Sequence, residues 1–451
     1  MLPLLFAFTL AQSVPAKPLE EILQIQSVRA LPGRLDVVPV FNSNSPELVL
    51  KEGILLSTFP PAGKKVTSAH LNFRLRGQFD IFAHHIAKAD PPENLRSLYL
   101  GIILHNPGTQ PLTINILQGA SYLSQPDAPF KELASLIPND LGTVFAGPGS
   151  RVMSDILRGQ RQDIFPPQII IPPGESQMLL NLPIPVQELR PPINGRSTYL
   201  RLRSNGNVYA ASLAMFARIN TDGSERAPNL AEWQNLLDNG ELSTPRDKVP
   251  TPITGNNKPA IYGRVAGVSR GSRWLANIVD KPQGRYLTIP QPGAAFSYGL
   301  STLHGGTWGT NQVQTAPMLV RYPDTAYYAH GNYGIQYTLD LPLYNNTKSE
   351  QTVSIAIQTP IKENQLSKPG LRFLNPPPRQ IFFRGTVRLR YQKQGEWQNK
   401  FFHLVQKRGE LGQSLVSLDI KPDKVSLVQV DFLYPPDASP PQVLTVSTQA
   451  K

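Results

Sequence analysis

The sequence predicts an all-β fold made of two immunoglobulin-like β-sandwich domains with long loop insertions and one short linker helix. Proline accounts for 45 of the 451 residues, about twice the usual share. It interrupts helix interiors but suits turns and strand ends. Short segments in which every second residue is apolar recur along the chain, and clusters of Asn, Pro and Gly separate them. A long helical bundle or a coiled coil is therefore excluded.

The clearest strands of the first half lie at residues 97–117, SLYLGIILHNPGTQPLTINIL. Apolar residues alternate over 98–104 and again over 112–116, with the turn sequence HNPG between them. A period of two predicts strands with one buried face. Residues 169–182 form a second strand–turn–strand segment around Pro-Pro-Gly, and residues 208–216 are expected to complete the domain.

The second half repeats this order. Apolar residues alternate over 337–341 and 353–357 around an Asn-Asn turn, and residues 416–432 contain the turn Lys-Pro-Asp. The Asn turn and the Pro turn lie 67 residues apart in the first half and 76 in the second. We therefore expect two related sandwiches, each with a long insertion between its hairpins. The alternative is that the two halves are unrelated and have acquired similar strand and turn patterns by convergence.

One helix is expected between the two halves. Asn229 is a good N-cap, and Glu232 three residues later completes a capping box. Leucines and a tryptophan fall on one face, and Asn239-Gly240 ends the helix. The Pro-, Thr- and Asn-rich segment 242–260 is typical of a linker. The expected organisation is a signal peptide at 1–16, a first sandwich domain at 17–228, the helix and linker at 229–260, and a basic second sandwich domain at 261–451.

The N-terminus predicts export. Residues 2–10 are apolar apart from Thr9, and small residues follow at Ala11 and Ala16. This pattern is typical of a signal peptide, and the run is too short to span a membrane. An N-terminal strand within the fold is the alternative. No later stretch is long and apolar enough for a transmembrane helix. We therefore expect a soluble mature chain in the periplasm, the outer envelope or the extracellular space.

The positive charge is unevenly distributed. The chain has a net charge of +12, yet residues 1–255 hold 22 Lys and Arg against 21 Asp and Glu. Residues 256–451 hold 22 against 11, a net charge of +11. Such an excess attracts anions over long range. The expected partners are an anionic envelope polysaccharide, lipid headgroups or another envelope protein. A basic surface that only supports solubility is the alternative.

Catalytic motifs are weak or absent. Residues 267–271 match G-x-S-x-G, but a nucleophile elbow needs a helix after it, and no helical pattern follows. Gly147-Pro148-Gly149 lacks the third glycine of a dinucleotide loop and is expected to form a tight turn. The chain has no cysteine, which excludes disulfides, thiolate metal sites and a cysteine nucleophile. No catalytic residue and no cofactor are assigned.

Seven histidines raise the question of a metal site. His84 and His85 are adjacent, so on a strand they point to opposite faces. Asp80 lies four residues before His84, on the same side of an extended strand. Imidazole and carboxylate ligands suit Zn²⁺. The alternative is that these histidines satisfy buried backbone groups or lie at the surface. The candidate ligands are Asp80, His84, His304 and His330.

Residues 304–334 are the segment most typical of a binding site. Glycine lets the backbone approach a ligand, and aromatic rings with polar tips stack on sugar faces. Asp and Arg side chains can bond hydroxyl groups. The composition predicts a glycan-binding loop, and a packed loop covering a sandwich end is the alternative. The candidate ligand-binding residues are His304, Trp308, Arg321, Tyr322, Asp324, Tyr327, Tyr328, His330 and Tyr333.

Basic residues mix with aromatic residues at 381–403, which raises the question of nucleic acid. Arg388 and Arg390 alternate with Val387 and Leu389, as on a solvated strand face. Export also argues against a nucleic-acid partner, so none is expected.

Several blocks together resemble a family of uncharacterised secreted proteins from cyanobacteria. The resemblance covers nearly the whole chain past the signal peptide and implies export and a domain of unknown function. It implies no catalytic residues. The blocks include LPGRLDVVPVFNSNSPE (31–47), GILLSTFPP (53–61), FDIFAHHIA (79–87), GPGSRVMSDILRG (147–159) and NGRSTYLRLRSNGNVYAASLAMFA (194–217).

These observations favour a non-enzymatic envelope or extracellular protein that binds an anionic glycan or another envelope component through its basic second half. Two alternatives stay open: an enzyme acting on envelope glycans, and a carrier of a small molecule or a metal. A glycosidase needs two carboxylates astride the scissile bond. The eleven carboxylates of the second half form no recognisable paired motif.

Overall fold

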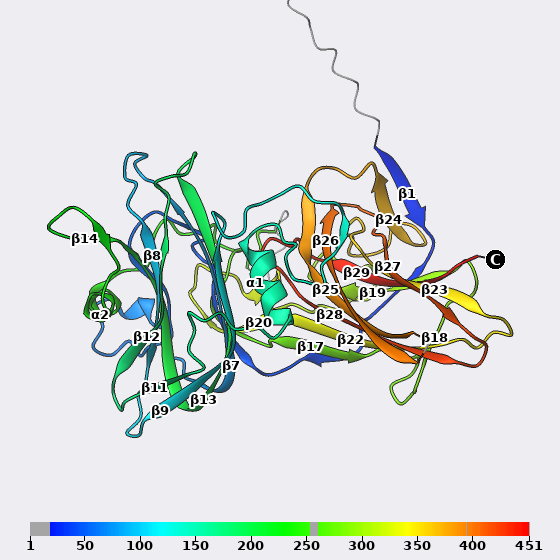
Figure 1. Cartoon of the computed structure of the whole chain (residues 1–451), viewed down its shortest axis with the longest axis horizontal. Helices are drawn as coiled ribbons and strands as arrows, with labels where there is room; N and C mark the ends of the chain where they lie inside the picture. Colours follow the sequence, from blue (N-terminus) through cyan, green and yellow to red (C-terminus); the bar gives the residue numbers. More distant parts are fainter. Residues whose placement is uncertain (1–18, 253–259, 394, 451) are drawn as a thin grey trace, which may run out of the picture.

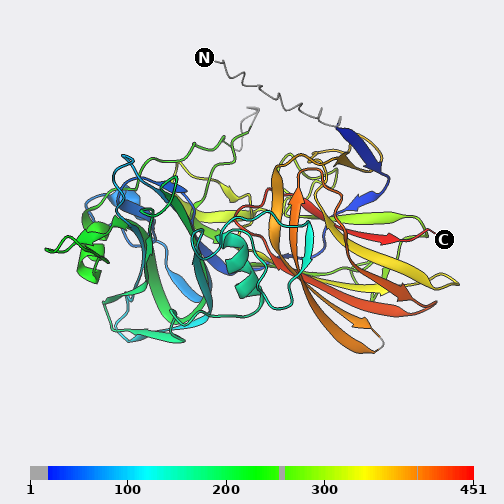
Figure 2. The ribbon, with the colours of Figure 1, turned by 45° about the horizontal axis from the view of Figure 1, so that its top comes forward.

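The computed structural model describes residues 19–252, 260–393 and 395–450, and these residues confirm the all-β prediction. In the described part, two α-helices accompany a chain that is otherwise built from strands. The strands gather in two lobes that lie side by side, the first mostly blue to green and the second mostly yellow to red (Figure 1 and Figure 2). The signal peptide predicted at residues 1–16 lies outside the described residues.

The first lobe is organised by one long strand, β13, which takes part in two layers. Residues 196–204 of β13 pair with β9, and residues 209–216 pair with β8, so the strand passes from one layer into the other. Apolar side chains from both layers form the core between them, among them Phe79, Ile102 and Leu200. The strands of this sheet are β4 (Pro39–Ser43), β5 (Leu48–Val49), β6 (Gly53–Ser57), β7 (Leu75–Lys88), β8 (Leu98–His105), β9 (Leu112–Leu123), β11 (Gln168–Ile171), β12 (Ser176–Ile184), β13 (Ile193–Phe216), β16 (Ala266–Arg270), β20 (Ala316–Arg321) and β21 (Tyr328–Ala329).

The second lobe consists of two sheets that share one core. Tyr337 and Val430 contribute from the larger sheet, and Ile355 and Leu444 from the smaller. The larger sheet contains β3 (Arg34–Leu35), β10 (Leu136–Pro138), β17 (Arg273–Asn277), β18 (Leu287–Thr288), β22 (Gln336–Tyr344), β25 (Ile381–Lys393), β26 (Glu396–Lys407) and β28 (Val425–Leu433). The smaller contains β2 (Ser27–Arg29), β19 (Ala295–Leu300), β23 (Gln351–Gln358), β27 (Ser414–Ile420) and β29 (Gln442–Thr448).

Short elements complete the described chain. Two small sheets stand apart from the large ones, and a single turn of 3-10 helix follows β6. These elements are β1 (Glu20–Gln24) paired with β24 (Leu371–Asn375), β14 (Arg218–Ile219) paired with β15 (Glu225–Arg226), and η1 (Thr67–Ala69).

The strand order of the first half recurs in the second, but the hairpin prediction is wrong. β8 and β9 flank the first Asn turn, yet β8 pairs with β12 and β9 pairs with β11. In the second half, β22 pairs with β28 and β23 pairs with β27 in the same way. Each turn therefore carries the chain between layers. Alternation of apolar residues reveals the buried face of a strand, but it does not reveal the neighbouring strand.

One buried asparagine ties the two turns together in each half. The side-chain amide of Asn106 donates to the carbonyl of Ile171 at 3.0 Å, and that of Asn345 donates to the carbonyl of Ile420 at 2.7 Å. The backbone N–H of each asparagine also donates to a carbonyl of the facing turn, at 3.0 and 3.1 Å. The two halves thus share a local geometry as well as a strand order.

Strand pairing crosses the domain boundaries expected at residues 228 and 261. The N-terminal strands β1, β2 and β3 pair with β24, β19 and β17 of the second lobe, and β10 pairs with β26. In the other direction, β16 pairs with β4 of the first lobe, and β20 extends the sheet from β16. The pairing reflects contacts between segments far apart in sequence, which a composition change at the linker does not reveal. Exchanged strands therefore join the two lobes.

A helix, α1 (Pro148–Leu157), lies between the lobes where the sequence predicts a tight turn (Figure 1). Gly147 occupies the N-cap at φ 86°, and proline at the first helical position is well suited to start a helix. Ile156 packs in one cluster with Tyr199 of the first lobe and Phe401 of the second. The turn prediction is wrong because Gly-Pro here starts a helix that both lobes cover.

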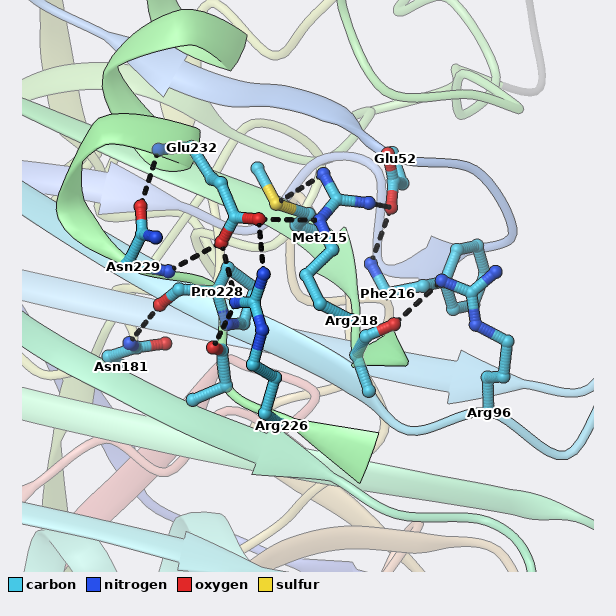
Figure 3. A network of polar contacts seen from close by, with 12 residues as sticks. Glu52, Arg96, Asn181, Met215, Phe216, Arg218, Arg226, Pro228, Asn229 and Glu232 are labelled. Atoms are coloured by element: carbon cyan, nitrogen blue, oxygen red, sulfur yellow. Dashed lines mark hydrogen bonds and ion pairs between the residues drawn. The ribbon is translucent and has the colours of Figure 1, made fainter. Parts of the chain in front are cut away.

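The predicted linker helix is confirmed as α2 (Leu230–Asn239), with both bonds of its capping box present. Asn229 accepts from the N–H of Glu232, and the Glu232 carboxylate accepts from the N–H of Asn229 (Figure 3). Arg226 adds two bonds of 2.8 Å to the same carboxylate. Trp233 is fully buried against the second layer of the first lobe. Local signals therefore place this helix correctly.

Replacing Glu232 with Gln is expected to lower the free energy of unfolding by about 1–2 kcal/mol at neutral pH. The hydrogen bond from Arg226 is the main cause that lowers the pKa of Glu232 to about 2, from an ordinary value of 4.5. A lowered folded-state pKa means that the stabilisation is complete above the ordinary value and is lost as the pH falls towards 2. Urea unfolding at neutral pH and at about pH 3 measures both effects. Glu188→Gln, at an exposed position, is the control, and an equal loss in both variants would contradict the assignment.

Candidate functional site

A cleft of about 690 Å³ opens where the linker meets the end of β4 and the loop after β21. We call it the linker cleft. Its walls come from within residues 42–47, 246–248, 261–265 and 329–333, and Pro436 of the second lobe closes one side. A ligand in this cleft would contact segments that are far apart in sequence and belong to both lobes.

Charged side chains of opposite sign pair within the linker cleft. Arg264 forms ion pairs with Glu47 and, at 3.3 Å, with Asp247. The Asp247 carboxylate also accepts from the Ser45 hydroxyl at 2.7 Å, which holds the linker against the segment after β4. Burial raises the pKa of Glu47, while the positive charge of Arg264 opposes the rise. This cluster positions the linker residues against the segment that follows β4.

Aromatic side chains separate the linker cleft from a smaller neighbour. The ring of Tyr262 lies 4.6 Å from that of His330, and its hydroxyl donates to the carbonyl of His304 at 2.7 Å. On the other side, His304, Tyr327 and Tyr328 line a pocket of about 230 Å³ with the same two rings. We call this the tyrosine pocket. The shared wall of Tyr262 and His330 makes the two cavities one aromatic-lined region.

Three buried polar atoms of residues that line the linker cleft lack hydrogen-bond partners within the described part of the chain. Among the described residues, the side-chain oxygens of Asn42 and Asn44 and Nδ1 of His330 have no partner. Burial lowers the pKa of His330 to about 4, so its ring is neutral at pH 7. An unpaired buried polar group costs about 1–3 kcal/mol, so natural proteins rarely keep several together outside functional sites. Their concentration is typical of a binding site.

Two of the predicted ligand-binding residues lie in hydrophobic cores. Trp308 is 1% exposed, and its indole N–H donates to the carbonyl of Ile361 at 3.0 Å. Tyr322 is 0% exposed, and its hydroxyl donates to the carbonyl of Ala69 at 2.7 Å. Neither ring therefore has an accessible face on which a sugar could stack.

Of the remaining candidates in residues 304–334, some line a cavity and others hold a side chain of the cavity wall in place. His330 and Tyr333 line the linker cleft, and His304, Tyr327, Tyr328 and His330 line the tyrosine pocket. Asp324 accepts two bonds from Arg246, at 2.7 and 3.2 Å, and so positions a residue of the cleft wall. Arg321 lies 3.8 Å from the ring of Tyr327 and stabilises its position.

The four candidate metal ligands do not form one site, because His304 and His330 line the tyrosine pocket whereas Asp80 and His84 lie elsewhere. Asp80 lies 2.8 Å from the Tyr199 hydroxyl and 3.6 Å from Arg201, inside the molecule. His84 bonds the Ser197 hydroxyl at 2.8 Å, and burial lowers its pKa to about 3. Within the described ranges, no group of three or more Asp, Glu or His side chains is placed to hold a metal ion. The structure thus gives these residues packing and hydrogen-bonding partners instead.

The residues that match G-x-S-x-G lie mostly in a strand, and no helix follows them, as the sequence predicts. Residues 266–270 form β16, Ser269 is buried, and β17 follows directly. A nucleophile elbow needs an exposed serine on a strand-to-helix turn. Ser269 is therefore not a nucleophile.

Sequence reasoning missed the residues that contribute most to the linker cleft. Tyr262 and Arg264 follow the segment 242–260, which the sequence analysis interpreted as a linker, and Asp247 lies within that segment. Asn42 and Asn44 belong to the polar run FNSNSPE after an apolar strand. The polar side chains that follow this apolar strand are the one sequence signal from which the cleft wall could have been predicted.

The fold and the cleft together define a β-rich protein of two strand-exchanged lobes with a polar and aromatic site at their junction. Residues 26–448 match the family described as "Protein of unknown function (DUF3370)", and the chain belongs to this family. The resemblance found in the sequence blocks is confirmed to that extent. A search of curated proteins found no match. Within the described residues, no helix has the length and apolar character needed to cross a membrane.

Proposed function

We propose that the protein is a non-enzymatic binding protein, exported to the periplasm, outer envelope or extracellular space of a cyanobacterium, that binds an anionic glycan or another envelope component. The linker cleft is the proposed binding site. Each lobe is proposed to derive from an immunoglobulin-like sandwich. The shared strand order and the paired turns at Asn106 and Asn345 support this finer assignment.

One observation carries the proposal: aromatic rings and unpaired polar atoms line the same cleft. Its volume of about 690 Å³ lies within the range of small-ligand sites. Tyr262 and Tyr333 offer rings with polar tips, and Asn42 and Asn44 offer amides. A sugar has apolar ring faces and hydroxyls that both donate and accept, so it matches this combination.

Charge supports an anionic form of that ligand. Arg246 and Arg264 are engaged with carboxylates, but Lys248 is exposed and forms no ion pair within the described part of the chain. The net charge of +11 over residues 256–451 adds long-range attraction. Lys248 is the side chain best placed to contact an acidic group at the rim of the cleft.

The full-length chain should bind hexagalacturonate, and Tyr262→Ala should weaken that binding about tenfold, or about 1.4 kcal/mol. Lys248→Ala should weaken binding only at low salt. The attraction between exposed charges is screened over a distance of about 10 Å in 0.1 M salt, and over shorter distances as the salt concentration rises. Titration calorimetry across a salt series measures both. Tyr286→Ala, an exposed tyrosine outside both cavities, is the matched control. Unchanged binding by Tyr262→Ala would remove the linker cleft from the proposal.

An enzyme acting on envelope glycans is the second candidate, and one observation favours it. Glu47 and Asp247 share Arg264, and burial raises the pKa of Glu47 in the direction that a general acid requires. Release of reducing ends from envelope glycan, lost in Glu47→Gln while binding is kept, would favour the enzyme. Binding without release in the wild type favours the non-enzymatic protein.

A carrier of a small molecule is the third candidate. The tyrosine pocket has a volume of only about 230 Å³, below the usual range for such sites. A carrier would therefore use the linker cleft as well, and its ligand would compete with the glycan.

A further inference from the structure

A second recessed surface lies on the second lobe, away from the linker cleft. It occupies about 530 Å³ on the face of the larger sheet that is not packed on the smaller one, across β17, β22, β28, β25 and β26. We call it the sheet-face groove. In Figure 1, these strands lie in the second lobe, from green β17 and yellow β22 to orange β25 and β26 and orange-red β28. None of its lining residues belongs to either cavity described above.

A row of polar side chains crosses the floor of this groove. The strand register places Asn277 beside Asp340, Asp340 beside Gln429, Gln429 beside Arg390, and Arg390 beside Asn399. Neighbouring strands are about 4.8 Å apart, so the row extends about 19 Å. Amides, a carboxylate and a guanidinium alternate along it. Such a row offers both donors and acceptors at regular intervals.

Part of this hydrogen-bonding capacity is unused. The Gln429 amide donates to Asp340, but its oxygen has no partner among the described residues. Nε of Arg390 likewise makes no hydrogen bond and lies 3.8 Å from the carboxylate of Asp431. Asp431 is buried and already accepts from Thr338 at 2.8 Å and from Arg388 at 3.2 Å. Asp431 and its partners lie beside the row on the same face of the sheet, while polar atoms in the row itself lack partners.

An exposed aromatic platform borders the row. Trp397 is 57% exposed, whereas Trp233, Trp274 and Trp308 are each at most 5% exposed. Leu427, at 39% exposure, lies in the same groove. An exposed indole beside polar groups provides a stacking surface for an apolar plane with polar edges. The chain carries four tryptophans, so Trp397 is the exception that needs a reason.

The charges of the groove balance. Arg388 and Arg390 lie beside Asp431, and Asp340 lies in the same row, so two positive and two negative charges cancel. An acidic polymer would meet the two carboxylates, and a basic one would meet the two guanidinium groups. A neutral ligand rich in hydroxyls meets neither cost, because some of its hydroxyls can donate to Asp340 while others, further along the row, accept from Arg390. A flat apolar protein surface would leave the polar row unpaired.

We propose that the sheet-face groove binds an extended, uncharged polysaccharide, which crosses the strands along the polar row and stacks one sugar ring on Trp397. This site goes beyond the proposed function because it differs from the linker cleft in place and in the charge of its ligand. The protein would then hold a neutral chain on the second lobe and an acidic group in the linker cleft.

Tryptophan fluorescence tests the groove directly in the full-length chain. Because only Trp397 is exposed, acrylamide should quench its emission and spare the other three tryptophans. Saturation with a bound neutral hexamer, chosen from cellohexaose, xylohexaose and mannohexaose, should protect Trp397 from quenching. Trp397→Phe should lose the quenchable fraction, and Trp397→Ala should weaken hexamer binding about tenfold. Leu141→Ala, at an exposed apolar position elsewhere, should change neither.

The outcomes separate this proposal from the linker cleft. Binding that Trp397→Ala weakens and Tyr262→Ala leaves intact supports the sheet-face groove. Binding of neutral hexamers that only Tyr262→Ala weakens overturns it, as does protection by hexagalacturonate alone. Absence of protection by all three neutral hexamers also overturns it. A concentration-dependent dimer that shields Trp397 without any sugar would assign the surface to a second copy of the chain and overturn it as well.

Discussion

Residues 261–451, expressed without the rest of the chain, are expected to remain largely unfolded, and they are expected to fold when residues 1–260 are co-expressed. The fragment lacks β1, β2, β3 and β10, each of which pairs with a strand of the second lobe. It also loses Leu31, which is 1% exposed in the core of that lobe. Burial of one such side chain contributes about 1.5–3 kcal/mol. That loss, together with the lost pairing of four strands, is a large fraction of a typical net stability of about 5–15 kcal/mol.

Circular dichroism and urea unfolding of the fragment, alone and co-purified with residues 1–260, measure this effect. A chain that joins residues 19–37 to residues 261–451 through a flexible linker is the matched control, because it restores β1 to β3. We expect this chain to recover part of the β signal. A cooperative unfolding transition in residues 261–451 alone would instead support the independent domains that the linker composition suggests.

Local signals in the sequence predict local structure well, and the reason is physical. The capping box of Asn229 and Glu232 involves residues three apart, so its partners are visible in the sequence. The Asn turns recur because a side-chain amide at Asn106 or Asn345 can reach carbonyls of a facing turn. The pairing of β4 with β16 joins residues more than 200 positions apart. No periodicity within either strand encodes that neighbour.

In the candidate site, too, the sequence predicts what depends on local composition and does not predict what depends on long-range strand pairing. Composition placed a binding site within residues 304–334, and His330 and Tyr333 do line the linker cleft. Composition does not distinguish an aromatic ring at a surface from one in a core, so it also selected Trp308. The opposite wall, formed by Asn42 and Glu47, comes from β4 and the residues after it, and it meets residues 261–265 only through the long-range pairing of β4 with β16. A wall of that kind becomes visible only when the strand pairing is known.

Replacing Gly334 with Ala is expected to lower the free energy of unfolding by about 3 kcal/mol. Gly334 precedes β22 in the second lobe and has φ 81°, where a residue with a Cβ is strained by about 1–2 kcal/mol. A Cβ there would also lie 2.1 Å from Cε2 of Tyr199 in the first lobe. Tyr199 is fully buried, and its hydroxyl lies 2.9 Å from the carbonyl of Gly334 and 2.8 Å from Asp80. The ring has no free space to enter, and overpacking of this kind costs about 1–3 kcal/mol.

Gly63→Ala separates strain from packing, because Gly63 has φ 77° and no atom lies within 4 Å of the place that a Cβ would occupy. We expect urea unfolding to show a loss of about 1 kcal/mol for Gly63→Ala, clearly smaller than for Gly334→Ala. In a Tyr199→Ala background, the cost of Gly334→Ala should fall to that of Gly63→Ala, because the opposing ring is gone. Equal costs at the two glycines in the wild-type background would mean that the lobes move apart here without penalty. The contact between Tyr199 and Gly334 would then not be among those that hold the two lobes together.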